Sequence, residues 1–157
     1  MTAIAIKAGE VAADSQLSGS NSACRVMKLV RLPDGSVAAG AGAMRDIYRA
    51  FVWLKSGAEG EGPEIDDATV AIVKPDHTIL LADGGWPAYP IMDTTYAIGC
   101  ASDLVRQALA DGLSPAEAVA KACRLDTNSS APIYTMTAQE PPKAPEFEGP
   151  KLHKARK

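Results

Sequence analysis

Thr2 is the residue whose type and position in this 157-residue chain most directly suggest chemistry. It follows Met1, and a small second residue permits removal of the initiator methionine, so we expect the mature chain to begin with Thr2. An N-terminal threonine carries a nucleophilic hydroxyl and a base, its own α-amine, whose ordinary pKa is about 7.7–8.0. That amine can take the hydroxyl proton, as the base of a nucleophile–base pair does. The alternative is that Met1 is removed, as in many proteins, with no chemistry at Thr2.

A short hairpin is expected to position the first partner of Thr2. Residues 3–6 (AIAI) form an apolar, partly β-branched run that predicts a buried strand. Residues 11–13 (VAA) follow a turn and predict the returning strand. Such a hairpin would carry Asp14 back to the level of Thr2.

Lys28 is a further candidate, because it lies in the middle of the strand-like segment 25–32 (RVMKLVRL). An ammonium group in apolar surroundings is costly without a partner, although strand alternation could turn it to solvent. Asp14 alone could be an ordinary turn residue, and Asp126 and Ser129 could form only the local hydrogen bonds of their loop.

The remaining pattern predicts an α+β fold. Residues 44–55 predict a helix, with Ile47, Phe51 and Leu54 on one face, and Ser114 begins a capping box that predicts another. Helices grouped in this order among antiparallel strands indicate helices flanking two packed sheets. The other expected elements are strands at residues 36–39, 68–73, 78–82, 96–98 and 131–137 and a helix at residues 100–110.

Composition excludes several classes of protein. No run of about 18 apolar residues is present to span a membrane, and the N-terminus lacks the basic and apolar regions of a secretory signal. Three cysteines are odd in number and show no metal-ligand spacing, so we expect reduced thiols, a cytoplasmic location, and neither metal nor cofactor. The formal net charge of −3 argues against a nucleic-acid-binding protein.

The chain divides into a folded domain, residues 1–137, and a tail, residues 138–157. The tail has four prolines and only two large apolar residues, with five Lys or Arg against three Glu. It has too little apolar surface to order itself, so we expect it to be disordered.

Several segments, in order, resemble proteasome β-subunits and bacterial HslV, the proteasome-type N-terminal nucleophile (Ntn) hydrolases. The resemblance covers residues 2–137 and suggests a shortened bacterial or phage-like member. The segments that carry it are residues 11–16 (VAADSQ), 28–32 (KLVRL), 39–46 (AGAGAMRD), 96–101 (YAIGCA) and 126–129 (DTNS). The resemblance implies a four-layer αββα sandwich.

The resemblance also implies catalytic roles. Thr2 would be the nucleophile and its amine the base. Lys28 would lower the pKa of both by placing positive charge beside them, and Asp14 would hold Lys28 charged and in place. The backbone N–H of Gly42 would stabilise the oxyanion.

Other roles follow in the same way. Asp126 and Ser129 would hydrogen-bond around the amine and hydroxyl. Ser18 falls where the family has a threonine that aligns the substrate backbone, and Gly40 falls near the floor of the primary specificity pocket, which would then be roomy. Cys100 stands where the family has a serine, and we expect it to support the network as a poorer hydrogen-bonding group.

The chain also departs from the family in its outer layer. Residues 57–63 (GAEGEGP) stand where a second long helix is expected, so that one outer helix is shortened or missing. The family assembles as stacked rings, which implies a homo-oligomeric ring of unknown size acting on polypeptides. No phosphate-binding glycine-rich motif with lysine is present, so any ATPase unfoldase would be a separate partner.

Three functions remain open at this point. The first is a threonine endopeptidase that acts through an acyl ester on Thr2. The second is an inert assembly subunit of the same fold, which the shortened outer layer and Cys100 suggest. The third is a small-molecule amidase that uses the same nucleophile.

Overall fold

The computed structural model describes residues 2–18, 23–141 and 149–153. Three helices are described: α1 (Met44–Lys55), α2 (Ser102–Ala110) and α3 (Pro115–Leu125). One antiparallel sheet has the order β10 (Thr95–Ile98), β1 (Ile4–Lys7), β2 (Glu10–Ala13), β11 (Tyr134–Thr137) and β12 (Lys151–Leu152). A second has the order β5 (Leu29–Arg31), β6 (Val37–Gly42), β7 (Ala68–Val73), β8 (Ile79–Asp83) and β9 (Tyr89–Ile91). β3 (Gln16–Ser18) and β4 (Ala23–Arg25) form a separate hairpin.

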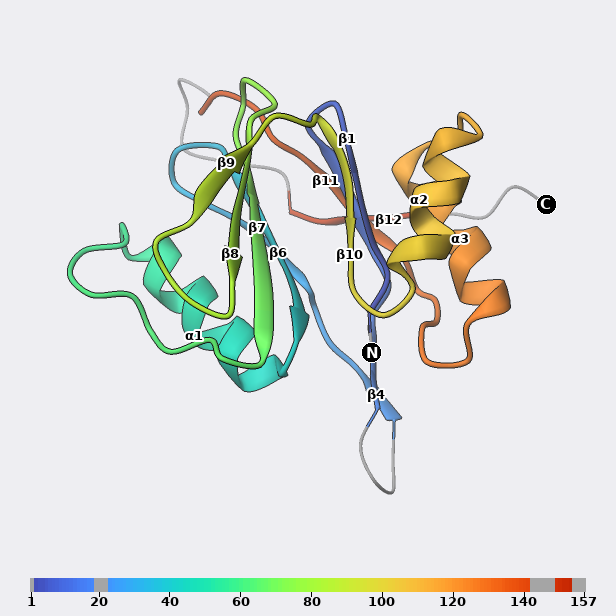
Figure 1. Ribbon diagram of the computed structural model, residues 1–157, viewed down its shortest axis with the longest axis horizontal. Coiled ribbons are helices and arrows are strands. Elements are labelled where there is room, and N and C mark those ends of the chain that lie inside the picture. Colours follow the sequence, from blue (N-terminus) through green and yellow to red (C-terminus); the bar gives the residue numbers. More distant parts are fainter. Residues whose placement is uncertain (1, 19–22, 142–148, 154–157) are drawn as a thin grey trace.

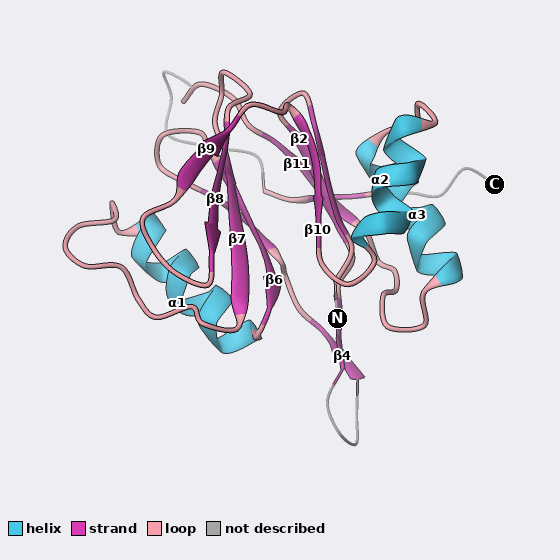
Figure 2. Ribbon diagram, in the orientation of Figure 1, coloured by secondary structure: helices cyan, strands magenta, loops and turns pink. Residues whose placement is uncertain are grey.

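The two large sheets face each other and carry helices on their outer sides (Figure 1). Helix α1 covers the β5–β9 sheet, and the α2–α3 pair covers the other sheet (Figure 2). The arrangement is therefore mixed α+β in four layers. None of the helices in the described ranges is long and apolar enough to cross a membrane.

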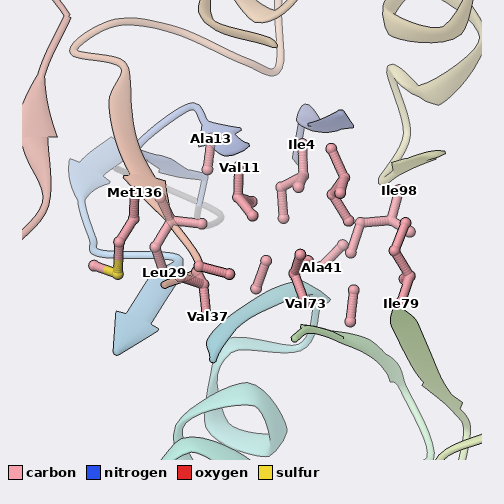
Figure 3. Packing of buried hydrophobic residues seen from close by; sticks show 14 of the residues in the cluster. Ile4, Val11, Ala13, Leu29, Val37, Ala41, Val73, Ile79, Ile98 and Met136 are labelled. Carbon is pink, nitrogen blue, oxygen red and sulfur yellow. The ribbon is translucent and has the colours of Figure 1, made fainter. Parts of the chain in front are cut away.

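Alternating side chains explain how one strand serves two layers. In β1, Ile4 and Ile6 point into the core between the sheets, whereas Ala5 and the preceding Ala3 pack against the helices α2 and α3. The large residues fill the space between the sheets (Figure 3), and burying each isoleucine contributes about 1.5–3 kcal/mol. The alanines let α2 and α3 approach closely. The same period of two places Thr2, one position before Ala3, on the side that faces the opposite sheet.

The predicted β1–β2 hairpin is present. Its two turn residues, Ala8 and Gly9, have φ values of 48° and 83°, as a two-residue turn with both φ values positive requires. Ile4 pairs with Ala13, and the backbone N–H of Asp14 donates to the carbonyl of Ala3 at 3.1 Å. The expectation that the hairpin returns Asp14 to the level of Thr2 is confirmed.

Residues 25–32 were expected to form one strand, and this is wrong. Arg25 ends β4, and Leu29 begins β5 in a different sheet. Between them, the backbone N–H of Val26 donates to the carbonyl of Ser15 at 2.8 Å, which ties the connection to the end of the β1–β2 hairpin. The chain thus changes sheets at Lys28, which a simple alternating pattern does not reveal.

Two shorter strands were also not expected. Tyr89–Ile91 forms β9 on the edge of its sheet despite Pro90, as an edge strand tolerates. In the segment expected to be a disordered tail, Lys151 and Leu152 pair with β11, and the N–H of His153 donates to the carbonyl of Ile133 at 2.9 Å. Backbone pairing to an open sheet edge needs little apolar side-chain surface. The tail residues 142–148 and 154–157 lie outside the described residues.

Residues 57–67, where the sequence predicted no second long helix, are all described and contain no helix. Helix α1 alone therefore covers its sheet among the described residues. It packs closely there because Gly40 of β6 lacks a side chain: a Cβ on Gly40 would lie 2.4 Å from Cγ2 of Ile47.

This contact gives a first prediction. Gly40→Ala should lower the free energy of unfolding by about 1–3 kcal/mol, because Ile47 is fixed on α1 and the helix must shift. Urea denaturation followed by circular dichroism measures the change. Gly85→Ala is the control, since a Cβ there meets nothing within 4 Å. In the double variant Gly40→Ala/Ile47→Ala, the loss of unfolding free energy should be smaller than the sum of the losses in the two single variants. Additive losses would show that the two positions do not clash.

Candidate active site

Thr2 lies two residues before β1, where the ends of several strands of both sheets meet. It is 3% exposed and lines a cleft of about 550 Å³. The end of β6, the start of β7 and the end of β8 form the opposite wall. The other lining residues are Ala41, Gly42, Asp66, Asp67, Ala68, Thr69, Asp83, Gly84, Gly99 and Cys100.

The turn between β10 and α2 holds the backbone of Thr2. The N–H of Thr2 donates to Cys100 Sγ at 3.3 Å, and the carbonyl of Thr2 accepts from the N–H of Ala101 at 3.3 Å. The Cys100 thiol also lies 3.6 Å from this carbonyl oxygen and can donate to it. Gly99 permits the approach: its φ is 103°, and a Cβ there would lie 2.1 Å from the Thr2 carbonyl oxygen.

Asp14 is a buried acceptor for four donors around Thr2. Its Oδ1 accepts from Lys28 Nζ at 2.9 Å and from the N–H of Ala3 at 2.9 Å. Its Oδ2 accepts from the N–H groups of Gln16 at 3.1 Å and Ser130 at 3.4 Å. One carboxylate therefore fixes the ammonium of Lys28 and the peptide that follows Thr2. The pairing of Asp14 with Lys28 that the resemblance implied is present.

The Asp14–Lys28 pair is fully enclosed. The side chains of Lys28 and Asp14 are 3% and 0% exposed. Two charges removed from water are tolerated only when they are close and well hydrogen-bonded. The break between β4 and β5 makes this possible, because it releases the Lys28 side chain from the alternation of a continuous strand.

Asp126 and Ser129 are connected to Thr2 by the contacts of Cys100. Ser129 Oγ donates to Asp126 Oδ2 at 2.7 Å, and Cys100 Sγ lies 3.7 Å from the same oxygen. The hydrogen bond from Ser129 holds the pKa of the Asp126 carboxyl below its usual range, and the N–H of Asn128 and the Cys100 thiol contribute in the same direction. The loop after α3 therefore presents an ionised carboxylate to the thiol that contacts Thr2.

Gly42 presents a backbone N–H that β7 does not use. Hydrogen-bonded pairs alternate along an antiparallel ladder, and the N–H of Ala43 donates to the carbonyl of Asp67 at 2.8 Å. Gly42, paired with Ala68, therefore points its N–H away from β7, on the side where the N–H of Gly40 donates to Lys28 O at 3.2 Å. β5 begins only at Leu29, so the strand offers Gly42 no next partner.

Two predicted binding residues lie elsewhere. Ser18 is exposed on β3, where its hydroxyl accepts from Gln16 Nε2 at 2.8 Å, and it does not line the cleft. Gly40 does not line the cleft either, because Ile47 of α1 occupies the space beside it. The absence of a side chain at Gly40 serves helix packing and does not widen this cleft.

Sequence reasoning missed the acidic wall of the cleft. Asp66 and Asp67 precede β7, and Asp83 ends β8, where it accepts from Thr69 Oγ1 at 2.6 Å. Their clustering depends on the β7–β8 register, in which Thr69 pairs with Asp83, and no local pattern contains it. Among the described residues, no group of three or more His, Cys, Asp or Glu side chains is arranged to hold a metal ion.

The buried ion pair gives the second prediction. Asp14→Asn removes the charge that faces Lys28 and should lower the free energy of unfolding by about 3–5 kcal/mol at neutral pH. Asp34→Asn is the matched control: Asp34 lies 2.8 Å from Lys74, but these side chains are 52% and 37% exposed. That change should cost less than about 1 kcal/mol. Chemical denaturation measures both, and equal losses would contradict the assigned burial.

Gly99 gives the third prediction, with a control of almost identical backbone geometry. Gly57 has a φ of 102°, but a Cβ there would meet nothing within 4 Å. Gly57→Ala should therefore cost only the conformational strain, about 1–2 kcal/mol. Gly99→Ala should cost measurably more in the same denaturation experiment, because its Cβ also strikes the Thr2 carbonyl. Equal costs would mean that Gly99 is not needed for this close approach.

Comparison with known proteins adds a structural likeness. A scan against protein-family models and a search of curated protein sequences find no match. A solved structure of Thiobacillus denitrificans BPH in complex with epoxomicin has a TM-score of 0.62 and 17% identity, covering 90% of this chain and 100% of that one. A second structure of Thiobacillus denitrificans BPH has a TM-score of 0.62 and 16% identity, covering 91% and 100%. At this identity, the likeness shows that the two proteins share a fold.

Proposed function

We propose that this chain is an N-terminal threonine peptidase with the αββα sandwich of proteasome-type Ntn hydrolases. The observation that carries the proposal is the position of Thr2: it lines a cleft and precedes the peptide that Asp14 binds together with Lys28. The Lys28 ammonium is held by the same carboxylate that binds the peptide after Thr2, and its positive charge would lower the pKa of the N-terminal hydroxyl and amine. The fold likeness to a protein solved in complex with epoxomicin supports the same reading, because epoxomicin is a peptide epoxyketone and proteasome inhibitor.

The proposed reaction begins when removal of Met1 turns the Thr2 nitrogen into a free amine. The amine takes the hydroxyl proton, and Oγ1 bonds to the carbonyl carbon of the substrate peptide. The N–H of Gly42, which β7 leaves unused, would stabilise the oxyanion; losing one such donor typically costs about 10²–10³ in rate.

The intermediate then collapses, and the carbon–nitrogen bond breaks. The amine of Thr2 returns its proton to the departing nitrogen, which leaves an acyl ester on Thr2. Water attacks this ester, and the amine serves again as base, so that a carboxylic acid and the free hydroxyl form. Asp126 and Ser129 act through Cys100 to orient the amine.

We also propose that the chain associates with itself on the outer face of α1. Tyr48 and Val52, one helical turn apart, are 65% and 52% exposed. An apolar face of this kind next to the segment without a helix suits contact with another subunit. In the same proposal, the copies form a ring whose size is open, and a separate ATPase unfoldase delivers the substrates. The substrates would be polypeptides.

The fourth prediction tests the nucleophile. The intact mass of the purified chain should lack Met1 and should increase by one inhibitor after incubation with epoxomicin, because an epoxyketone reacts with both the hydroxyl and the amine of an N-terminal threonine. Thr2→Ala should be processed and folded but should not gain this mass. Retained Met1, or a processed and folded chain that never gains mass, would contradict the peptidase and favour an inert assembly subunit. Labelling accompanied by turnover of small amides, but not of peptides, would favour an amidase.

A further inference from the structure

The cleft beside Thr2 carries an uncompensated negative charge. Asp66, Asp67 and Asp83 line it, and none of its lining residues is Lys, Arg or His. The ion pairs between described residues involve other carboxylates, so none of these three is neutralised by a neighbouring cation within the described ranges. Carboxylates gathered along a concave wall focus their field and raise the local concentration of cations.

The three carboxylates of this acidic wall differ in how they are held. Asp83 Oδ1 accepts from Thr69 Oγ1 at 2.6 Å, which fixes its side chain at the end of β8. The side chains of Asp66 and Asp67 are exposed, and within the part of the chain that the structure describes they accept no hydrogen bond. Their oxygens are therefore available to a ligand that enters the cleft.

The arrangement of the acidic wall suits a long organic cation better than a metal ion. In the described part of the chain, no group of three or more His, Cys, Asp or Glu side chains is arranged to hold a metal. Carboxylates spread along a wall can instead accept from an ammonium or guanidinium group at several positions, without the ordered coordination that a metal ion requires. The Lys and Arg side chains of a polypeptide have this chemistry.

An independent observation places the proposed nucleophile in the same cleft. Thr2 is 3% exposed and lines the cleft, yet its hydroxyl forms no hydrogen bond with any described residue. A buried hydroxyl calls for a partner, and a bound substrate can supply it. The acidic wall is close to the proposed oxyanion donor as well, because a Cβ on Gly42 would lie 2.2 Å from the carbonyl oxygen of Asp67. The charge of the wall therefore lies beside the bond that Thr2 would cut.

We propose that Asp66, Asp67 and Asp83 determine specificity by selecting polypeptides that carry Lys or Arg next to the scissile bond. The inference rests on the proposed function and names its class of substrate. Charge-assisted hydrogen bonds from an ammonium or guanidinium group to the wall hold the cationic side chain in the cleft. An acidic side chain at the same position meets charges of its own sign and is disfavoured.

The exposure of the wall sets the size of the effect. A single exposed ion pair contributes little. Several carboxylates in one cleft act on the same cation, however, and raise its local concentration by about tenfold or more. We therefore expect a preference of about tenfold for Lys over a neutral side chain. Because the charges are exposed, added salt should weaken this preference.

The fifth prediction compares peptides of one sequence that carry Lys, norleucine or Glu at a residue flanking the scissile bond. Norleucine has an unbranched aliphatic side chain like that of Lys, but no charge. For the processed chain, kcat/KM should be about tenfold higher with Lys than with norleucine at one or both flanking positions, and lower still with Glu. Raising the salt concentration from about 0.05 M to about 0.5 M should reduce the Lys-to-norleucine ratio, because it shortens the distance over which exposed charges act.

Two variants connect this ratio to the acidic wall. Asp66→Asn/Asp67→Asn removes two charges with little change of shape, and Asp83→Asn keeps an oxygen that can accept from Thr69. Each should lower the Lys-to-norleucine ratio, and Asp67→Lys should favour Glu over Lys. The ratio is taken within one variant, so a general loss of activity cancels. Asp93→Asn is the matched control and should keep the ratio of the parent, since Asp93 is exposed and does not line the cleft.

The outcomes separate this inference from the proposed function. Equal kcat/KM values for the three peptides, or a preference for Lys that is undiminished in both Asn variants, would overturn this inference alone. Epoxomicin labelling without cleavage of any peptide would leave the nucleophile in place and overturn the class of substrate. A chain that gains no epoxomicin and cleaves none of the peptides would overturn the proposed function and this inference with it.

Discussion

The structure depends on the buried ion pair between Asp14 and Lys28. A carboxylate and an ammonium without access to water are costly, so the surrounding backbone must supply the remaining hydrogen bonds. It does so from three places: Ala3 just before β1, Gln16 at the start of β3, and Ser130 in the loop after α3. These contacts bring together segments more than a hundred residues apart in sequence. The contacts of the candidate site therefore form only when these distant segments have come together.

Much of the fold could be predicted because its signals are local. The AIAI run, the two-residue turn after it and the apolar face of α1 each fix an element within a few residues. The β3–β4 hairpin, β9 and β12 could not be predicted in this way. Their strands have two or three residues each, and they exist because a neighbouring edge or connection offers backbone partners. Lys28 illustrates the same limit: its segment is strand-like throughout, yet the chain changes sheets there.

Residues of the candidate site could likewise be predicted only where a local signal identifies them. Asp14 could be placed beside Thr2 because a hairpin links them. The pairing of Lys28 with Asp14 was implied by the family resemblance, because an ammonium in an apolar segment calls for a partner without identifying it. Gly40 was assigned to a pocket, but a glycine only shows that something lies close, and here it is Ile47. Asp66, Asp67 and Asp83 could not be grouped without the β7–β8 register, although they set the charge of the cleft.

The contacts around Thr2 also explain why some positions constrain the site more than others. Gly42 and Gly99 both have positive φ, and a Cβ on either would lie within 2.2 Å of a backbone oxygen. Backbone atoms cannot yield without moving a strand, so neither position can carry a side chain cheaply. Cys100 is different, because its exposed side chain touches Thr2 and Asp126 through one rotatable atom. The geometry around Thr2 is therefore fixed by the backbone at the two glycines, whereas the contacts from Cys100 depend on the rotamer of one side chain.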